Sequence, residues 1–134
     1  MTNAALLLDA DFATLPDLVR AHAQERPDAL AVADPGSQLT WLALNRMVDS
    51  VAARLQQDGI GPGMTTAIAG LNSVMQVVVL LGTLRAGAMA GLITNTATGE
   101  QMAAMVRDTG AQHLFLDAKA AESLVGEDYG AVTP

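Results

Sequence analysis

Cysteine does not occur in the 134-residue sequence, and histidine occurs only twice. The first absence excludes disulfide bonds, zinc–thiolate sites and cysteine nucleophiles. The second argues against a metal site built from several histidines. Aromatic residues make up only 3% of the chain, against 51% apolar residues in total. We therefore expect one domain with a single core, filled mainly by Leu, Val, Ala and Met side chains.

Positive charge is also scarce. Seven Lys and Arg side chains face fourteen Asp and Glu side chains, which gives a formal net charge of −7. The single lysine of the sequence is Lys119. Proteins that bind a phosphate backbone or an anionic membrane surface need a cluster of basic residues. The sequence therefore predicts neither a nucleic-acid partner nor a membrane partner.

The sequence has no uninterrupted apolar run of the ~20 residues that a membrane-spanning helix needs. Its most hydrophobic stretch, residues 74–93, is broken by Gln76, Thr83 and Arg85. We expect a buried helix followed by a buried strand in this stretch. The first eleven residues lack the basic region of a secretory leader, so the expected compartment is the cytoplasm.

Helical and strand patterns alternate along most of the chain. Apolar residues recur at helical spacing from Leu44 to Leu55, which marks the clearest helix. The alternation predicts an α/β fold, a layered and largely parallel sheet with flanking helices. The expected elements are a helix from Thr14 to Pro27, a hairpin of residues 30–33 and 38–40, a helix at 40–59, a strand at 65–69, a helix from Asn72 or Ser73 to Arg85, a strand at 88–93, a helix at 98–110 that opens with a capping box, and a strand at 113–116.

We divide the chain into three parts. Residues 1–12 form an N-terminal extension, residues 13–118 form the α/β unit, and residues 119–134 form an acidic tail of small residues. The extension is expected to be mobile. In the tail, the one regular element we expect is a single helical turn at residues 120–125.

Two loops superficially resemble anion-binding motifs. The glycines at residues 59–63 follow a helix and precede a strand, whereas a dinucleotide-binding loop follows a strand and opens a helix. We interpret them as a helix end. Residues 94–99 precede a helix, but no lysine is near in the sequence and Glu100 would repel an anion. We interpret this loop as a helix cap.

Other polar residues do not form a convincing catalytic set. The pairs Asp9/Asp11 and Glu127/Asp128 lie near the chain ends and are interpreted as solvated carboxylates. No serine lies in a nucleophile-elbow context.

The histidines are interpreted as structural. His22 lies on the inner face of its helix and is expected to be packed and hydrogen-bonded, and His113 opens a strand without an acidic or serine partner at a recognisable spacing. We therefore assign no catalytic, cofactor-binding or metal-ligating residue to this chain.

Five short segments nevertheless occur in an order that resembles a known family. Each is weak alone, but the five together span residues 14–116 with matching gaps. They resemble the amino-terminal segment of the adenylate-forming, AMP-dependent acyl-CoA synthetase and ligase family. The segments are Thr14–Leu18 with Glu25–Val32, Leu39–Leu44 (similar to LTYxEL), Leu55–Met64 (similar to L…GVxPGD), Asn72–Ser73 with Leu84–Ala88 (similar to NSxxf…lRAGA), and Thr98–Met102 with Arg107–Ala111 (similar to tpxEl…l.dsgA).

The resemblance implies a two-step reaction in a longer parent protein. A carboxylate attacks ATP to give an acyl-adenylate, and a thiol, commonly coenzyme A, then displaces AMP. ATP, Mg and coenzyme A are therefore implied for the parent, but the family's catalytic motifs lie downstream of the matched segment, and none can be placed on this chain. Where the family often has P-L-N-P-R, this sequence has Leu92–Thr96. Thr96 cannot supply the Arg charge that contacts coenzyme A in some members.

Three functional hypotheses follow. The first is an amino-terminal fragment of an ATP-dependent acid–thiol ligase, catalytically inactive and without a bound cofactor when isolated, whose partner is the remainder of the synthetase. The second is a stand-alone, non-catalytic interaction domain of the same family, expected to be a well-packed monomer or symmetric dimer. A severed fragment is instead expected to expose an apolar face, which offers a surface for a homo-oligomer. The third is an unrelated nucleotide-binding α/β domain, for which Gly70, Leu71 and Asn72 mark the expected ligand position.

Overall fold

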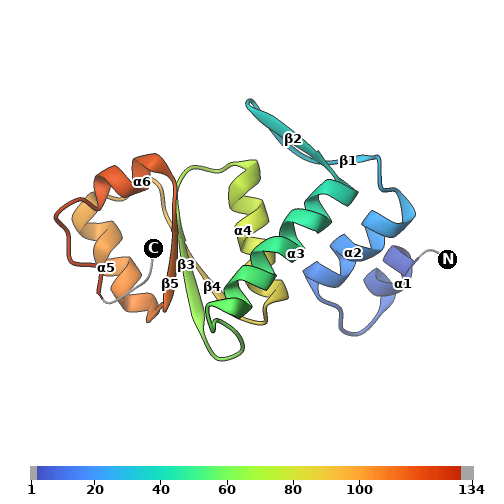
Figure 1. Ribbon diagram of the computed structural model, residues 1–134, viewed down its shortest axis with the longest axis horizontal. Helices are drawn as coiled ribbons and strands as arrows, with labels where there is room; N and C mark the ends of the chain where they lie inside the picture. Colours follow the sequence, from blue (N-terminus) through green and yellow to red (C-terminus); the bar gives the residue numbers. More distant parts are fainter. Residues whose placement is uncertain (1–2, 131–134) are drawn as a thin grey trace.

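The computed structural model describes residues 3–130. Its strands form two separate sheets, an antiparallel hairpin of β1 and β2 and a parallel sheet with the order β4-β3-β5 (Figure 1). The predicted layered α/β fold with a largely parallel sheet is confirmed. In chain order the elements are α1 (Asn3–Asp9), α2 (Leu15–Glu25), β1 (Leu30–Asp34), β2 (Ser37–Thr40), α3 (Trp41–Gln57), β3 (Thr65–Ala69), α4 (Val74–Arg85), β4 (Met89–Ile93), α5 (Gly99–Thr109), β5 (His113–Leu116) and α6 (Ala118–Ser123).

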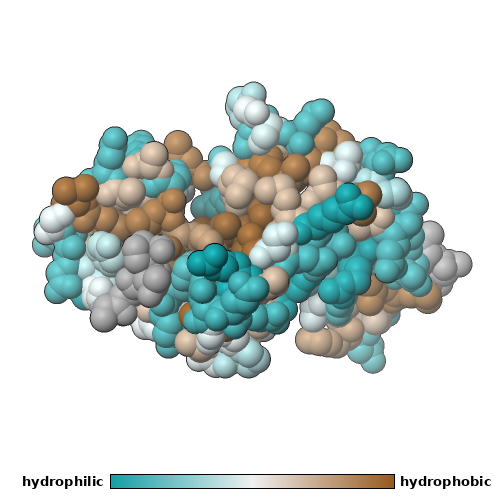
Figure 2. Space-filling view, in the orientation of Figure 1, coloured by the Kyte–Doolittle hydropathy of each residue, from teal (hydrophilic) through white to brown (hydrophobic). Residues whose placement is uncertain are grey.

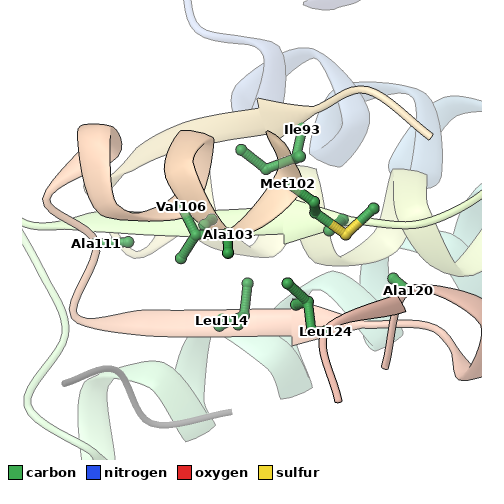
Figure 3. Close-up of a cluster of buried hydrophobic side chains, with 10 residues drawn as sticks. Ile93, Met102, Ala103, Val106, Ala111, Leu114, Ala120 and Leu124 are labelled. Atoms are coloured by element: carbon green, nitrogen blue, oxygen red, sulfur yellow. The ribbon is translucent and has the colours of Figure 1, made fainter. Parts of the chain in front are cut away.

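The parallel sheet lies between two helical layers, with α3 and α4 on one face and α5 and α6 on the other (Figure 1). Side chains alternate between the two faces of a strand. Ala67 and Ala69 of β3 therefore enter the core beneath α5 and α6, whereas Ile68 faces Val51 and Val79 of the other layer. Figure 3 shows how side chains of β4, β5, α5 and α6 converge in the first of these cores.

A second core joins α2, α3, α4 and the hairpin. Val19 of α2 and Val78 of α4 are buried there. They pack with Leu44 and Val48, which follow the helical spacing that the sequence predicted for α3. The close approach of α3 and α4 requires Gly82, because a Cβ at that position would lie 2.6 Å from the Cβ of Val51. Glycine inside a helix is otherwise unfavourable, so the loss of helix propensity at Gly82 is offset by the close packing that it permits.

The buried guanidinium of Arg85 links three helices. Its side chain is 8% exposed. It donates hydrogen bonds to the carbonyl of Pro16 (2.8 Å), the carbonyl of Asn45 (3.2 Å) and the carboxylate of Asp49 (2.8 Å). Burial lowers the pKa of Arg85, and the charge of Asp49 opposes that shift. Arg85 thus ties the ends of α2 and α4 to the middle of α3.

Helix starts follow the sequence signals closely. Thr14, Thr40, Ser73 and Thr98 each accept a hydrogen bond from the backbone three residues later. The alternative between Asn72 and Ser73 is resolved in favour of Ser73. The predicted capping box is also confirmed, because the side chain of Gln101 accepts from the backbone of Thr98 at 3.0 Å.

The N-terminal extension contains a helix that the sequence did not predict. α1 packs against α2 through Ala4, which is 4% exposed, and the backbone N–H of Ala4 donates to Glu25 at 3.0 Å. A seven-residue helix is marginal on its own, so α1 depends on this contact with α2.

The expected burial of the fourth strand, predicted at residues 88–93, is wrong. β4 is an edge strand, and Met89 and Leu92 are each 59% exposed, while Ile93 is buried. The helix and strand predicted in the stretch 74–93 are otherwise found as α4 and β4. Within residues 3–130, no helix combines the length and apolarity needed to cross a membrane.

The tail is more ordered than the expected single turn. α6 starts at Ala118, so the predicted boundary at residue 118 falls at its start. Leu124 is 3% exposed and packs into the core beneath α5, and Arg107 donates to the backbone carbonyl of Asp128. The last part of the predicted tail, residues 131–134, lies outside the described residues.

Candidate functional site

The carboxyl ends of the three parallel strands meet at one edge of the sheet. β3 continues into residues 70–73, β4 into Thr94 and Asn95, and β5 into Asp117. Open α/β sheets bind ligands outside the carboxyl ends of their strands. This edge includes Gly70, Leu71 and Asn72, the position predicted for the third hypothesis.

Two cavities border this edge. The larger, about 500 Å³, is mostly apolar and lies between α3, α4 and the ends of β3 and β5, where Ile68, Leu71, Met75, Val79 and Phe115 line it. The smaller, about 410 Å³, lies between α4 and the end of β4. Its lining is mixed, with the polar residues Asn72, Gln76, Thr94 and Asn95 beside the apolar residues Val77, Leu80, Leu92 and Ile93. The residues after β3 line both cavities.

The cavities lack the charge that a nucleotide triphosphate requires. Among the residues that line the two cavities in the described part of the chain, none is Lys or Arg, and the larger cavity includes the carboxylate of Asp117. Lys119 lines only a neighbouring space of about 10 Å³. ATP phosphates need cationic or Mg²⁺ neutralisation, so these residues alone do not fit ATP.

Two carboxylates contact the loop after β3. Asp117 accepts hydrogen bonds from the backbone N–H groups of Leu71 and Ala120, both at 2.7 Å. Asp34, in the hairpin turn, accepts from Val74 N–H at 2.8 Å. These backbone donors, Val74 first, hold the pKa of Asp34 below its usual value of 3.8.

The two histidines lie away from this edge of the sheet. The ring of His22 is 4.5 Å from that of Trp41, and its Nδ1 accepts from Arg26 at 3.3 Å. His113 begins β5 at the opposite end of the strand and contacts Phe115 edge-to-face at 4.8 Å. Burial lowers the pKa of His113 below 6.5, although the charge of Asp58 opposes the shift. Both histidines occupy packing positions.

The carboxylate pairs and the glycine loop do not line the two cavities. Asp9 ends α1, and Asp128 accepts from the backbone of Gly130 at 3.0 Å. Gly59 and Gly63 have positive φ values of 81° and 82° at the turn between α3 and β3, as a helix end requires. In residues 3–130, no group of three His, Asp or Glu side chains is arranged to hold a metal ion.

The sequence model of a family described as AMP-binding enzyme matches residues 19–132. The chain belongs to this family. The result agrees with the resemblance found in the sequence, since the curated relatives and structural neighbours are adenylate-forming synthetases.

Curated relatives include large peptide synthetases. The phosphinothricin tripeptide synthetase PhsB of Streptomyces viridochromogenes is 38% identical over 108 residues, which cover 80% of this chain and 9% of the relative. A dimodular nonribosomal peptide synthase of Bacillus subtilis is 30% identical over 112 residues, which cover 84% of this chain and 5% of the relative. The chain therefore spans less than a tenth of either protein.

Solved structures share the fold. The N-terminal domain of FACL13 from Mycobacterium tuberculosis superposes with a TM-score of 0.82 at 22% identity, over 91% of this chain and 33% of that one. The N-terminal subdomain of NpsA from Klebsiella oxytoca, in complex with anthranilyl-AMSN, has a TM-score of 0.74 at 20% identity, over 89% and 30%. At these identities the likeness concerns the fold.

Two residues at this edge escaped sequence reasoning. The sequence assigns no role to Asp34, which lies between the two predicted hairpin strands, or to Asp117, because the backbone groups through which they hold the loop after β3 lie 40 and 46 residues away. A local signal existed for Asp117, since an Asp directly after a strand and before a run of small residues is a typical helix N-cap. Its second contact, with Leu71, has no local signal.

Proposed function

We propose that this chain forms the amino-terminal structural part of an adenylate-forming synthetase and contributes one wall of its ligand crevice. The proposal rests on the open edges of the parallel sheet and on the cavity beside it. Edge strands present unpaired backbone groups to which further strands can pair. In residues 3–130, β4 and β5 are both edge strands, and a mostly apolar cavity of about 500 Å³ stays open beneath α3 and α4. The remainder of the synthetase is the partner that would complete this layer.

In the parent protein, the proposed reaction has a carboxylate displace pyrophosphate from ATP to give an acyl-adenylate, and a thiol then displaces AMP to give a thioester. This chain would supply shape and no charge, because the two cavities at its carboxyl edge are lined without Lys or Arg in the described residues. The phosphate-handling groups would come from the rest of the synthetase.

The relatives favour a particular acid. Both peptide synthetases described above are named for assembling peptides, which supports an amino acid as the acid. Thr96 supports an acceptor other than coenzyme A, because it replaces the Arg that contacts the coenzyme A phosphates in some members of the resembling family. Fatty acids and free coenzyme A are the alternative that the structural neighbour FACL13 represents.

The first experiment measures ATP–pyrophosphate exchange with panels of amino acids, aryl acids and fatty acids. The 134-residue chain alone should give no exchange, whereas the natural reading frame extended past Pro134 should give exchange with an amino acid. Exchange by the isolated chain would overturn the structural role. Exchange by the longer protein with fatty acids alone would overturn the choice of acid and leave the structural role standing.

A thermal shift with Mg-ATP provides the second readout. A ligand present at 100 times its Kd stabilises a protein by about 2.7 kcal/mol. The isolated chain should show no saturable shift, because its crevice lacks cations. A saturable shift would contradict the proposal.

A second candidate function is a stand-alone interaction domain that associates through this apolar surface. Leu71, Met75 and Leu92 are between 49% and 59% exposed, and hydrophobic residues gather over α4 and beside the parallel strands in Figure 2. Sedimentation distinguishes the candidates. A dimer that Met75→Lys dissociates, and that Met105→Lys on α5 does not, would favour self-association.

A further inference from the structure

The loop of residues 70–73 connects β3 to α4 and separates the two cavities at the carboxyl edge. Gly70 lines both cavities, Leu71 lines the larger one, and Asn72 lines the smaller one. Leu71 and Asn72 are themselves exposed. Apolar packing therefore does not hold this loop in place.

Asp117 holds the start of the loop. Its Oδ2 accepts from Leu71 N–H and its Oδ1 from Ala120 N–H, both at 2.7 Å. One carboxylate thus caps α6 and binds the loop at the same time. Hydrogen bonds to a charged acceptor are roughly twice as strong as neutral ones.

Gly70 makes room for this carboxylate. A Cβ on Gly70 would lie 2.7 Å from both Cγ and Oδ2 of Asp117. The φ of Gly70 is +157°, a value that residues with a side chain rarely adopt. The backbone at residue 70 and the carboxylate of Asp117 therefore fit one another, and a side chain at residue 70 would displace the carboxylate.

Asp34 holds the other end of the loop. Its Oδ2 accepts from Val74 N–H at 2.8 Å, at the first turn of α4, while its Oδ1 accepts from the N–H groups of Gly36 and Ser37, both at 2.8 Å. The hairpin, which shares no backbone pairing with the parallel sheet, is thereby fixed to the start of α4. The negative charge also lies at the positive end of the helix dipole.

We propose that Asp34 and Asp117 act together as positioning residues, a two-point clamp that sets the conformation of the loop 70–73 between the two cavities. Each carboxylate is anchored in its own turn, Asp34 in the hairpin and Asp117 at the start of α6. The loop is held from both sides by elements far away in the sequence. Its shape, and with it the wall between the cavities, is preorganised before any ligand or partner arrives.

Amide hydrogen exchange of the 134-residue chain tests the clamp. Asp117→Ala should accelerate exchange at Leu71 by about tenfold or more, and it should also accelerate exchange at Val74, where Asp34 is the acceptor. Asp34→Ala should have the reciprocal effect at both amides. Asp117→Asn retains an acceptor oxygen and should restore part of the protection. Asp108→Ala, an exposed acid on α5 with the same charge change, should alter neither amide.

Two hydrogen-exchange results would overturn the clamp. If each Ala variant accelerates only the amide that it contacts, the two carboxylates are independent caps and the clamp is wrong. Unchanged exchange at Leu71 in Asp117→Ala also overturns it. If Asp117→Ala does not fold, Asp117→Asn carries the same comparison, with smaller accelerations expected at the same two amides.

A double-mutant cycle measures the coupling energy between residues 70 and 117. If Asp117 only capped α6, this coupling would be absent. Gly70→Ala should destabilise the wild-type background more than the Asp117→Ala background, because removing the carboxylate removes the two 2.7 Å contacts that a Cβ would meet. Additive effects in urea unfolding would mean that Gly70 and Asp117 are not coupled, and would overturn that part of the clamp.

Discussion

The two faces of the parallel sheet differ in how completely their side chains are buried by the rest of the chain. The face beneath α5 and α6 is sealed, with Ala67, Leu114 and Val106 each at most 1% exposed. The face beneath α3 and α4 buries Thr66 and Ile68 but leaves a cavity of about 500 Å³ at its carboxyl end. The first face is therefore filled within this chain, whereas the second keeps an open, mostly apolar cavity, which is the feature behind the proposed structural role.

The largest expected effect tests the sealed face. Leu114→Ala should destabilise the chain by about 2–5 kcal/mol, because the surrounding core cannot relax into the cavity. Phe115→Ala removes more atoms but opens a side chain that is only half-buried, and should cost less. Urea unfolding measures both free energies. A larger loss for Phe115→Ala would reverse the assignment of the sealed and open faces.

Substitution of Arg85 tests how much its hydrogen bonds to α2 and α3 stabilise the packing of these helices against α4. Arg85→Met removes the charged donor that bonds the carbonyls of Pro16 and Asn45 and the carboxylate of Asp49, and should cost about 2 kcal/mol, within the range for hydrogen bonds to a charged group. Arg54→Met is the control, because the Arg54–Asp58 pair is exposed (76% and 38%) and such pairs contribute 0–1 kcal/mol. If chemical unfolding shows that both variants lose the same free energy of unfolding, the buried contacts of Arg85 do not stabilise the helix packing.

A stabilising substitution is expected within the same layer. The hydroxyl of Thr66 is fully buried and has no hydrogen-bond partner among the described residues. Thr66→Val should therefore raise stability by about 1 kcal/mol. Thr83 is buried equally, but its hydroxyl donates to the carbonyl of Val79 at 2.8 Å, so Thr83→Val should not stabilise. Melting temperatures of the two variants make the comparison, and a lower melting temperature for Thr66→Val would refute it.

The smallest expected effect concerns pH at the edge strand β5. Burial lowers the pKa of His113 in the folded chain below 6.5, so the unfolded chain takes up this proton more readily. The contribution of His113 to stability is complete above pH 6.5 and falls as the pH drops through the folded pKa. His113→Gln should flatten this part of the stability profile between pH 7.5 and 5. An unchanged slope would mean that His113 is not responsible.

Local signals predicted most of the fold. The caps at Thr14, Thr40 and Thr98 act within three residues, so the sequence contains the whole interaction. α1 escaped prediction because its stability depends on Glu25, 21 residues away from Ala4. The exposure of β4 escaped because an apolar strand has the same pattern at an edge as in the centre of a sheet.

The candidate site was predicted only as a location. Placing ligands at the carboxyl end of β3 follows from the α/β order of elements, and the predicted residues Gly70, Leu71 and Asn72 do line the cavities. The contacts of Asp34 and Asp117 with this loop were not predicted, because no short-range pattern reports a hydrogen bond across 40 residues.

The sequence by itself determined the family, the order of helices and strands, and the shortage of positive charge. These properties depend on composition and on interactions between residues a few positions apart. The tertiary structure decided which face of the sheet is sealed, where the cavities lie and which carboxylates hold the loop after β3. Those properties depend on contacts between distant segments, whose geometry exists only once the chain has packed.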